Sequence, residues 1–173
     1  MNYIAIDETS FCPNDFKKYG YSNKGKEIQK VLKHHHSQRR FSAISAISKD
    51  GLLLAIGKPG SIKSADYLYF LTLIAKDHPG KTLLHDNASI HRSKLVKNWA
   101  FKNNIKIIYN SPYTSQFNPI ELSFSKAKTL FRSLPDHIDM KSNITTCINS
   151  ITKEDAFNFF RHTKNIISSY KTN

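Results

Sequence analysis

Short apolar runs occupy most of the first two thirds of the chain and predict the strands of a sheet. They cover residues 3–6, 41–48, 51–56, 82–84 and 105–109, and each is rich in aliphatic and aromatic side chains. Lys49-Asp50-Gly51 joins the second run to the third, and Asp-Gly between two apolar runs is typical of a tight hairpin turn. We therefore predict five strands, with the second and third forming a β-hairpin that pairs with the first.

Four later stretches carry apolar residues at intervals of three and four, which predicts amphipathic helices. The first begins at Ser64 as its N-cap and ends at His78-Pro79-Gly80, and the second covers about residues 93–102. Asn118 as N-cap, with Pro119 in the first helical position, begins the third, and residues 153–170 form the fourth. The side chains expected to face the core are Leu68, Leu71, Ala75, Leu95, Val96, Trp99, Ile120, Phe124, Ala127, Phe131, Phe157, Phe160 and Ile167.

Two segments give weaker patterns. Residues 143–149 fit either a short strand or a helical turn, and residues 10–38 are polar and basic, as in an irregular or weakly stranded segment. No repeat and no linker rich in Pro or Gly divides the chain, so we expect one domain over residues 1–173. The element order predicts an α/β fold, in which helices flank both faces of a mixed five-stranded sheet.

Charge changes this picture by adding a class of partner. The chain has 26 Lys and Arg against 13 Asp and Glu, a net charge of +13. Such an excess indicates a polyanion such as nucleic acid, although a solvated basic surface explains the charge equally well. Cys12 and Cys147 lack the spacing of a zinc site or a disulfide framework. Without an apolar run of about 18 residues or a signal peptide, we expect a soluble intracellular protein with no membrane partner.

Three acids stand at the ends of predicted elements. Asp7 and Asp86 each end an apolar run, and Glu121 lies at a helix start 34 residues after Asp86 (121 − 86 − 1). Carboxylates so placed can converge at one edge of a sheet, where two Mg²⁺ ions bound by oxygen ligands can catalyse phosphoryl transfer. Glu8, beside Asp7, is a further candidate ligand.

Each acid also has a structural explanation when it is taken alone. Asp7 is compatible with a turn cap, Asp86-Asn87 is a common turn dipeptide, and Glu121 has the spacing of a capping box with Asn118. The set of three acids in a strongly basic chain favours catalysis.

Four segments in order carry a resemblance to a known family. Residues 7–11, 19–25, 85–91 and 111–121 resemble the successive motifs of the DDE transposases of the mariner-like superfamily, especially its bacterial insertion-sequence branch. The resemblance implies an RNase H-like fold with Asp7, Asp86 and Glu121 as catalytic and metal-binding residues, and Mg²⁺ or Mn²⁺ as two ions. It also implies cleavage of double-stranded DNA at transposon ends, transfer of the 3′-hydroxyl into target DNA, and a homodimer assembled on DNA. The protein would work in a bacterial cytoplasm or nucleoid, or in a eukaryotic nucleus.

Other residues match the family motifs less directly. Glu8, Asn87, His91 and Asn118 are expected to support the site, and His91 is compatible with contact to DNA, contact to an acid, or a purely structural role. The candidate DNA-binding residues are Lys33, Arg39, Arg40, Lys94, Lys97, Lys126, Lys128 and Arg132. The run His34 to His36 is better explained as a solvated basic loop than as a metal site, because adjacent side chains diverge.

The chain departs from the family in two places. Members usually carry a helix-turn-helix recognition domain before the first acid, and only six residues precede Asp7 here. We therefore expect a catalytic domain without its own recognition domain, which a separate chain could supply. Gln116 also replaces the usual acidic residue before Asn-Pro. The remaining alternatives are another RNase H-like nuclease, such as a resolvase or ribonuclease, and an inactive transposase-derived protein that only binds DNA.

Overall fold

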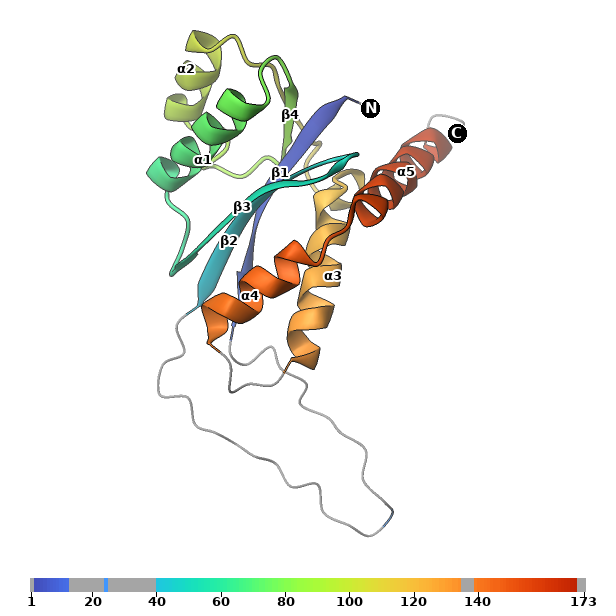
Figure 1. The fold of residues 1–173 in the computed structure, drawn as a ribbon. Helices are drawn as coiled ribbons and strands as arrows, with labels where there is room; N and C mark the ends of the chain where they lie inside the picture. The colour runs from blue at the N-terminus through green and yellow to red at the C-terminus, as the bar shows by residue number, and fades with distance from the viewer. Residues whose placement is uncertain (1, 13–23, 25–39, 135–138, 171–173) are drawn as a thin grey trace.

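The computed structural model describes residues 2–12, 24, 40–134 and 139–170 (Figure 1). Most of the segment 10–38 therefore lies outside the described residues. So do the DNA-binding candidates Lys33 and Arg39 and the run His34 to His36.

Five strands form one mixed sheet in the order β3-β2-β1-β4-β5. They are β1 (Tyr3–Phe11), β2 (Phe41–Ser48), β3 (Gly51–Pro59), β4 (Thr82–His85) and β5 (Ile107–Tyr109). The β1–β2 and β2–β3 pairs are antiparallel, whereas β4 runs parallel to both β1 and β5. The predicted five-stranded mixed sheet and its hairpin at Asp50-Gly51 are thus confirmed.

Helices cover both faces of this sheet, as predicted (Figure 1). On one face lie α1 (Ser64–Asp77) and α2 (Lys94–Lys102). On the other lie α3 (Ile120–Ser133), α4 (Met140–Asn149) and α5 (Lys153–Ser169). The single turn η2 (Ser115–Phe117) leads into α3, and residues 143–149, which fitted a strand or a helical turn, belong to α4. No helix among the described residues is long and apolar enough to cross a membrane.

The central strand β1 divides its side chains between the two layers. Ile4 and Ile6 pack in the core beneath α1 and α2, whereas Ala5 and Phe11 pack on the side of α3. Successive side chains of a strand alternate between faces. Asp7 and Glu8, which are adjacent on this strand, therefore face opposite layers.

The first strand is longer than predicted, which corrects the expected position of Asp7. Residues 7–11 continue the ladder with β2, from Asp7 opposite Ser45 to Phe11 opposite Phe41. Four of these five residues are polar, so no hydrophobic pattern marks them, and the backbone pairing with β2 stabilises the extension. Asp7 therefore lies in the middle of a strand and not at its end.

Smaller corrections concern the helices. Lys63, not Ser64, is the N-cap of α1, and its backbone N–H donates to the Asp66 carboxylate at 2.8 Å. Leu95 and Phe157 were predicted to face the core but are 47% and 53% exposed. The helices α2 and α5 each bury a narrower stripe than their apolar residues suggest. The stripe is formed in α2 by Val96 and Ala100, and in α5 by Ala156, Phe160 and Thr163.

Candidate active site

The register of the two parallel strands β1 and β4 brings Asp7 and Asp86 level. Tyr3 pairs with Thr82, Ile4 with Leu83 and Ala5 with Leu84, so partners differ by 79 in number. Asp86 directly follows the last residue of β4, and 86 − 7 is also 79. The strand β4 thus ends at His85, whereas β1 continues beyond this level. The two carboxylates meet at this step, beside the carboxyl end of β4.

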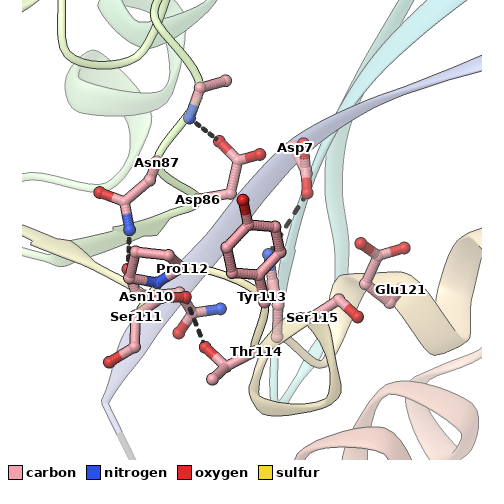
Figure 2. A pocket seen from close by; sticks show the side chains of 12 residues that line it. Asp7, Asp86, Asn87, Asn110, Ser111, Pro112, Tyr113, Thr114, Ser115 and Glu121 are labelled. Carbon is pink, nitrogen blue, oxygen red and sulfur yellow. Dashed lines mark hydrogen bonds between the residues drawn. The ribbon is translucent and has the colours of Figure 1, made fainter.

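A pocket of about 280 Å³ opens at this step. Asp7, Asp86 and Glu121 all line it, so the structure brings the three predicted acids to one cavity (Figure 2). The opposite wall comes from the segment that follows β5 and ends at the first residue of η2. Its lining residues are Asn110, Ser111, Pro112, Tyr113, Thr114 and Ser115.

Glu121 reaches the pocket from the first turn of α3. The helix begins at Ile120, with Pro119 in the cap position, one residue later than predicted. The Asn118 backbone N–H donates to the Ser115 carbonyl at 2.8 Å, so the expected capping box between Glu121 and Asn118 is wrong. Among the described residues, no hydrogen bond holds the Glu121 carboxylate. Partial desolvation raises its pKa, Lys128 opposes that rise and Asp86 adds to it.

Two asparagines support this arrangement. Asn118 is buried, its side-chain oxygen accepts from the Ile120 N–H at 3.4 Å, and its amide donates to Asp7 Oδ2 at 3.5 Å. The Asn87 amide donates to the Asn110 carbonyl and ties the end of β4 to the end of β5. Both asparagines therefore form part of the pocket wall.

His91 lies behind the pocket, fully buried, with a carboxylate on each ring nitrogen. Its Nδ1 is hydrogen-bonded to Asp86 Oδ1, and its Nε2 lies 2.9 Å from Glu8 Oε2. The ring stacks on Tyr67 with centroids 4.5 Å apart and planes 27° from parallel. Of the interpretations that the sequence left open, the structure places His91 against acids. Burial alone would lower its pKa, but the hydrogen bonds to Asp86 and Glu8 raise the pKa of His91 to about 9.

The side chains of Asp7 and Glu8 point to opposite faces of the sheet, because successive side chains alternate along a strand. Asp7 faces the pocket on the α3 side, and Glu8 faces His91 on the opposite layer. Burial, reinforced by the nearby Asp86 charge, raises the pKa of Asp7 to about 7, although the Glu8 N–H donates to its Oδ1 at 2.7 Å. Asp86 differs, because its hydrogen bond with His91 lowers its pKa.

The donor atoms fit a hard divalent cation. One ligand atom each from Asp7, Asp86 and His91 lies within 4.8 Å of the other two. Both His91 nitrogens already engage carboxylates, so oxygens are the donors that remain for an ion. Glu121 lines the same pocket but does not join this compact group. Carboxylate oxygens with open space beside them suit Mg²⁺ or Mn²⁺, which keep several waters.

The candidate DNA-binding residues lie on different surfaces. Arg40 and Lys128 line a second groove of about 370 Å³ that shares Glu121 with the first pocket. Lys94, Lys97 and Arg132 are exposed on α2 and α3. Lys126 instead forms an ion pair with Asp155 of α5, so it links two helices.

Sequence reasoning did not single out two residues of this site. Tyr67, in the first turn of α1, supports the His91 ring, and its hydroxyl lies 3.2 Å from His85 Nδ1. Tyr113 lines the pocket and lies within a motif segment that was read mainly for its Asn-Pro-Ile-Glu end. No residue pattern marks it, because its backbone angle and its exposure are properties of the folded chain.

Solved structures with the same fold come from a transposase. A Mos1 mariner paired-end complex with Mn matches 94% of this chain and 52% of the Mos1 chain, with a TM-score of 0.75 and 15% identity. The Mos1 strand transfer complex matches 94% and 51%, with a TM-score of 0.71 and 13% identity. The Mos1 catalytic domain with Raltegravir and Mg matches 97% and 83%, with a TM-score of 0.65 and 15% identity.

These matches show a shared RNase H-like fold, and the chain spans about half the length of the Mos1 chains in the two complexes. No curated protein sequence matches the chain. A protein-family model described as DDE superfamily endonuclease matches residues 2–144, which include the three acids of the pocket. The chain therefore belongs to the DDE superfamily endonucleases.

Proposed function

We propose that this chain is the catalytic domain of a transposase, which cleaves DNA at transposon ends and joins the freed 3′-hydroxyl to target DNA. The observation that carries the proposal is the convergence of Asp7, Asp86 and Glu121 on one pocket in a DDE superfamily chain. The names of its structural neighbours, a paired-end complex and a strand transfer complex of Mos1, support this reaction type.

Asp7, Asp86 and Glu121 would hold two divalent ions. When bound, Mg²⁺ or Mn²⁺ supplies charge stabilisation to the attacking and leaving oxygens of an in-line phosphoryl displacement. The Asn118 amide orients Asp7, and His91 fixes Asp86 by its Oδ1 without acting as a ligand itself. Water is the nucleophile for cleavage and the DNA 3′-hydroxyl is the nucleophile for joining. Both reactions can use the same carboxylate oxygens as metal ligands.

The surface beside Glu121 suits a phosphate backbone. The second groove places the basic residues Arg40 and Lys128 beside Glu121, and phosphate contacts supply most of the affinity of proteins for DNA. We propose that double-stranded DNA lies along this groove, with Lys94, Lys97 and Arg132 as more distant contacts. Joining requires two ends, so the active unit would be a dimer on DNA, with a separate recognition chain as a further partner.

A plasmid assay tests the reaction. A supercoiled plasmid carrying the DNA that flanks this gene is incubated with protein and Mn²⁺, with and without EDTA. Open circles should form only when the metal is present. Asp86→Asn should slow nicking at least about a hundredfold, because metal ligation contributes several kcal/mol to such transition states. Asp77→Asn is the matched control, since Asp77 is exposed at the end of α1 and does not line the pocket.

The products distinguish transposition from the alternatives. A labelled 3′-end that becomes joined to a second plasmid supports a transposase, whereas hydrolysis alone indicates another RNase H-like nuclease. Equal nicking by the wild type and Asp86→Asn would contradict the catalytic assignment. Tight DNA binding with no cleavage in Mg²⁺ or Mn²⁺ would indicate a protein that only binds DNA.

A further inference from the structure

Tyr113 is an exposed aromatic side chain beside the acids. Its relative exposure is 102%, so its ring makes almost no contact with the rest of the described protein. Most aromatic side chains of this size gain their stabilisation by burial. A ring left fully in solvent at the rim of a polar pocket therefore has its faces available to a ligand.

The backbone holds Tyr113 in a conformation that side chains with a Cβ rarely adopt. Its φ is 60°, in the left-handed region, and among the described non-glycine residues only Asn104 shares this sign. A left-handed backbone costs about 1–2 kcal/mol for such a residue. Asn tolerates it better than Tyr, so local structure alone would not select Tyr at this position.

Hydrogen bonds on either side fix the loop that carries this residue. Thr114 Oγ1 donates to the Ser111 carbonyl at 2.6 Å, and the Phe117 N–H donates to the Thr114 carbonyl at 3.0 Å. Pro112, whose ring restricts its own φ, precedes the tyrosine. These contacts therefore fix the backbone from which the ring projects before any ligand binds.

The position of the ring relates it to the acids. Tyr113 lines the same 280 Å³ pocket as Asp7, Asp86 and Glu121, and in Figure 2 it stands in front of that pocket. A phosphodiester bound at the acids would therefore bring a neighbouring base to this wall of the pocket. The part of a nucleotide that suits an uncharged aromatic face is the base, because base–aromatic stacking accepts every base.

We propose that Tyr113 stacks on an unpaired base next to the phosphodiester held at the acids. The inference rests on the proposed function for the nature of the substrate. A base inside a duplex has both faces covered by its neighbours, so the ring selects a base that is unpaired or has left the stack. Tyr113 would then bind DNA that is open at the reacting position more tightly than a closed duplex.

Fluorescence of 2-aminopurine tests this directly in the full chain. The probe is a short duplex with a 3′ overhang of a few nucleotides that contains 2-aminopurine, and a blunt duplex of the same sequence is the control. Wild-type protein should quench the overhang probe as the ring stacks on it, and Tyr113→Phe and Tyr113→Trp should retain the quenching. Tyr113→Asn should abolish it and weaken overhang binding about tenfold, with little change for the blunt duplex.

Tyr113→Asn is the informative variant because Asn accepts the left-handed backbone. Overhang binding and quenching by Tyr113→Asn equal to those of the wild type would overturn the proposal. So would an equal loss for both probes, which indicates a backbone contact, or the absence of binding by the wild type. Because the probes report binding and not cleavage, Tyr113-dependent quenching in a protein that never nicks DNA would contradict the proposed reaction and leave the stacking role standing.

Discussion

His91 is buried between two carboxylates and carries the positive charge that separates them. Glu8 lies on Nε2 and Asp86 on Nδ1, and Glu8 Oε1 is itself buried without a partner among the described residues. Removing the imidazole from such a group leaves two like charges without compensation in a poorly solvated site. His91 thus stabilises the folded chain and orients Asp86 in the same contact.

Replacing this imidazole should therefore destabilise the protein in a way that a divalent ion can partly reverse. His91→Gln should lower the free energy of unfolding by about 2–3 kcal/mol, because a buried charged hydrogen-bond pair is lost. Added Mn²⁺ should raise the melting temperature of His91→Gln more than that of the wild type, since the ion supplies positive charge beside Asp86. Thermal unfolding with and without Mn²⁺ measures both effects.

A second substitution controls for general damage at this position. In the His91→Gln background, Glu8→Gln should cost less stability than it does in the wild type, because the unpaired charge is removed with it. Equal melting shifts with Mn²⁺ in the wild type and in His91→Gln would contradict the role of His91 as the local countercharge.

At the scale of elements, most strands and helices followed from hydrophobic pattern, and the corrections have specific causes. Asp50-Gly51 and the Asn118-Pro119 start were readable because turn and cap chemistry is local. The continuation of β1 to Phe11 was not, since the polar residues of its second half are held by pairing with a strand about 35 residues away. Leu95 and Phe157 were misplaced because a helix pattern shows which residues are apolar, whereas the neighbouring elements decide which of them are covered.

The same distinction applies to the site. The three acids could be selected from their positions at the ends of apolar runs and at a helix start. The link from His91 to Glu8 spans 83 residues and depends on strand alternation, so the sequence left that role open. Tyr113 needed its backbone angle and exposure, which no residue pattern supplies.

Asp155 joins two helices of the α3 layer and makes a prediction for an element. Its Oδ2 accepts from the Thr152 N–H at 2.8 Å at the start of α5, and Lys126 of α3 also donates to it. Asp155→Asn should lower the free energy of unfolding by about 1 kcal/mol, as expected for a weakened capping box. Glu154→Gln, a neighbouring exposed acid in the same turn, should change it little.

The pH dependence of this difference has a definite sign. The hydrogen bond from Lys126 lowers the pKa of Asp155, so the folded chain favours the ionised carboxylate more than the unfolded chain does. Its contribution is complete above the unfolded pKa of about 4 and is lost as the pH falls through the folded value. Chemical denaturation at pH 6 should show this gap in the free energy of unfolding between the wild type and Asp155→Asn. The gap should shrink below about pH 4. A gap that widens on acidification would contradict the role of this carboxylate.

At the scale of the molecule, a chain with a net charge of +13 carries a site built from acids. The acids repel phosphate until a cation binds, while the basic surface attracts the polyanion at long range. Under the proposed function, binding and catalysis would therefore depend on different charges and would respond differently to salt and to metal.

Salt titration of DNA binding separates these contributions. The logarithm of the affinity for duplex DNA should fall linearly with the logarithm of salt concentration, as expected when bound phosphates release counterions. Lys128→Gln, in the groove shared with Glu121, should reduce that slope by about one, whereas Lys76→Gln on α1 should leave it unchanged. Fluorescence anisotropy over a series of salt concentrations gives the slopes, and identical slopes for the wild type and Lys128→Gln would exclude a phosphate contact there.

The alternation along β1 limits how this protein can change. Asp7 and Glu8 are both acidic, yet one faces the pocket and the other faces His91. A single-residue deletion or insertion ahead of Asp7 would keep both carboxylates in the chain and exchange their sides, if the strand kept Ile4 and Ile6 in their layer. Because β1 is paired on both edges, such a slip would also break its ladders with β2 and β4. We therefore expect this segment to tolerate substitutions that conserve side-chain character but no change in length, so natural variation in length should be confined to the connections outside the strand.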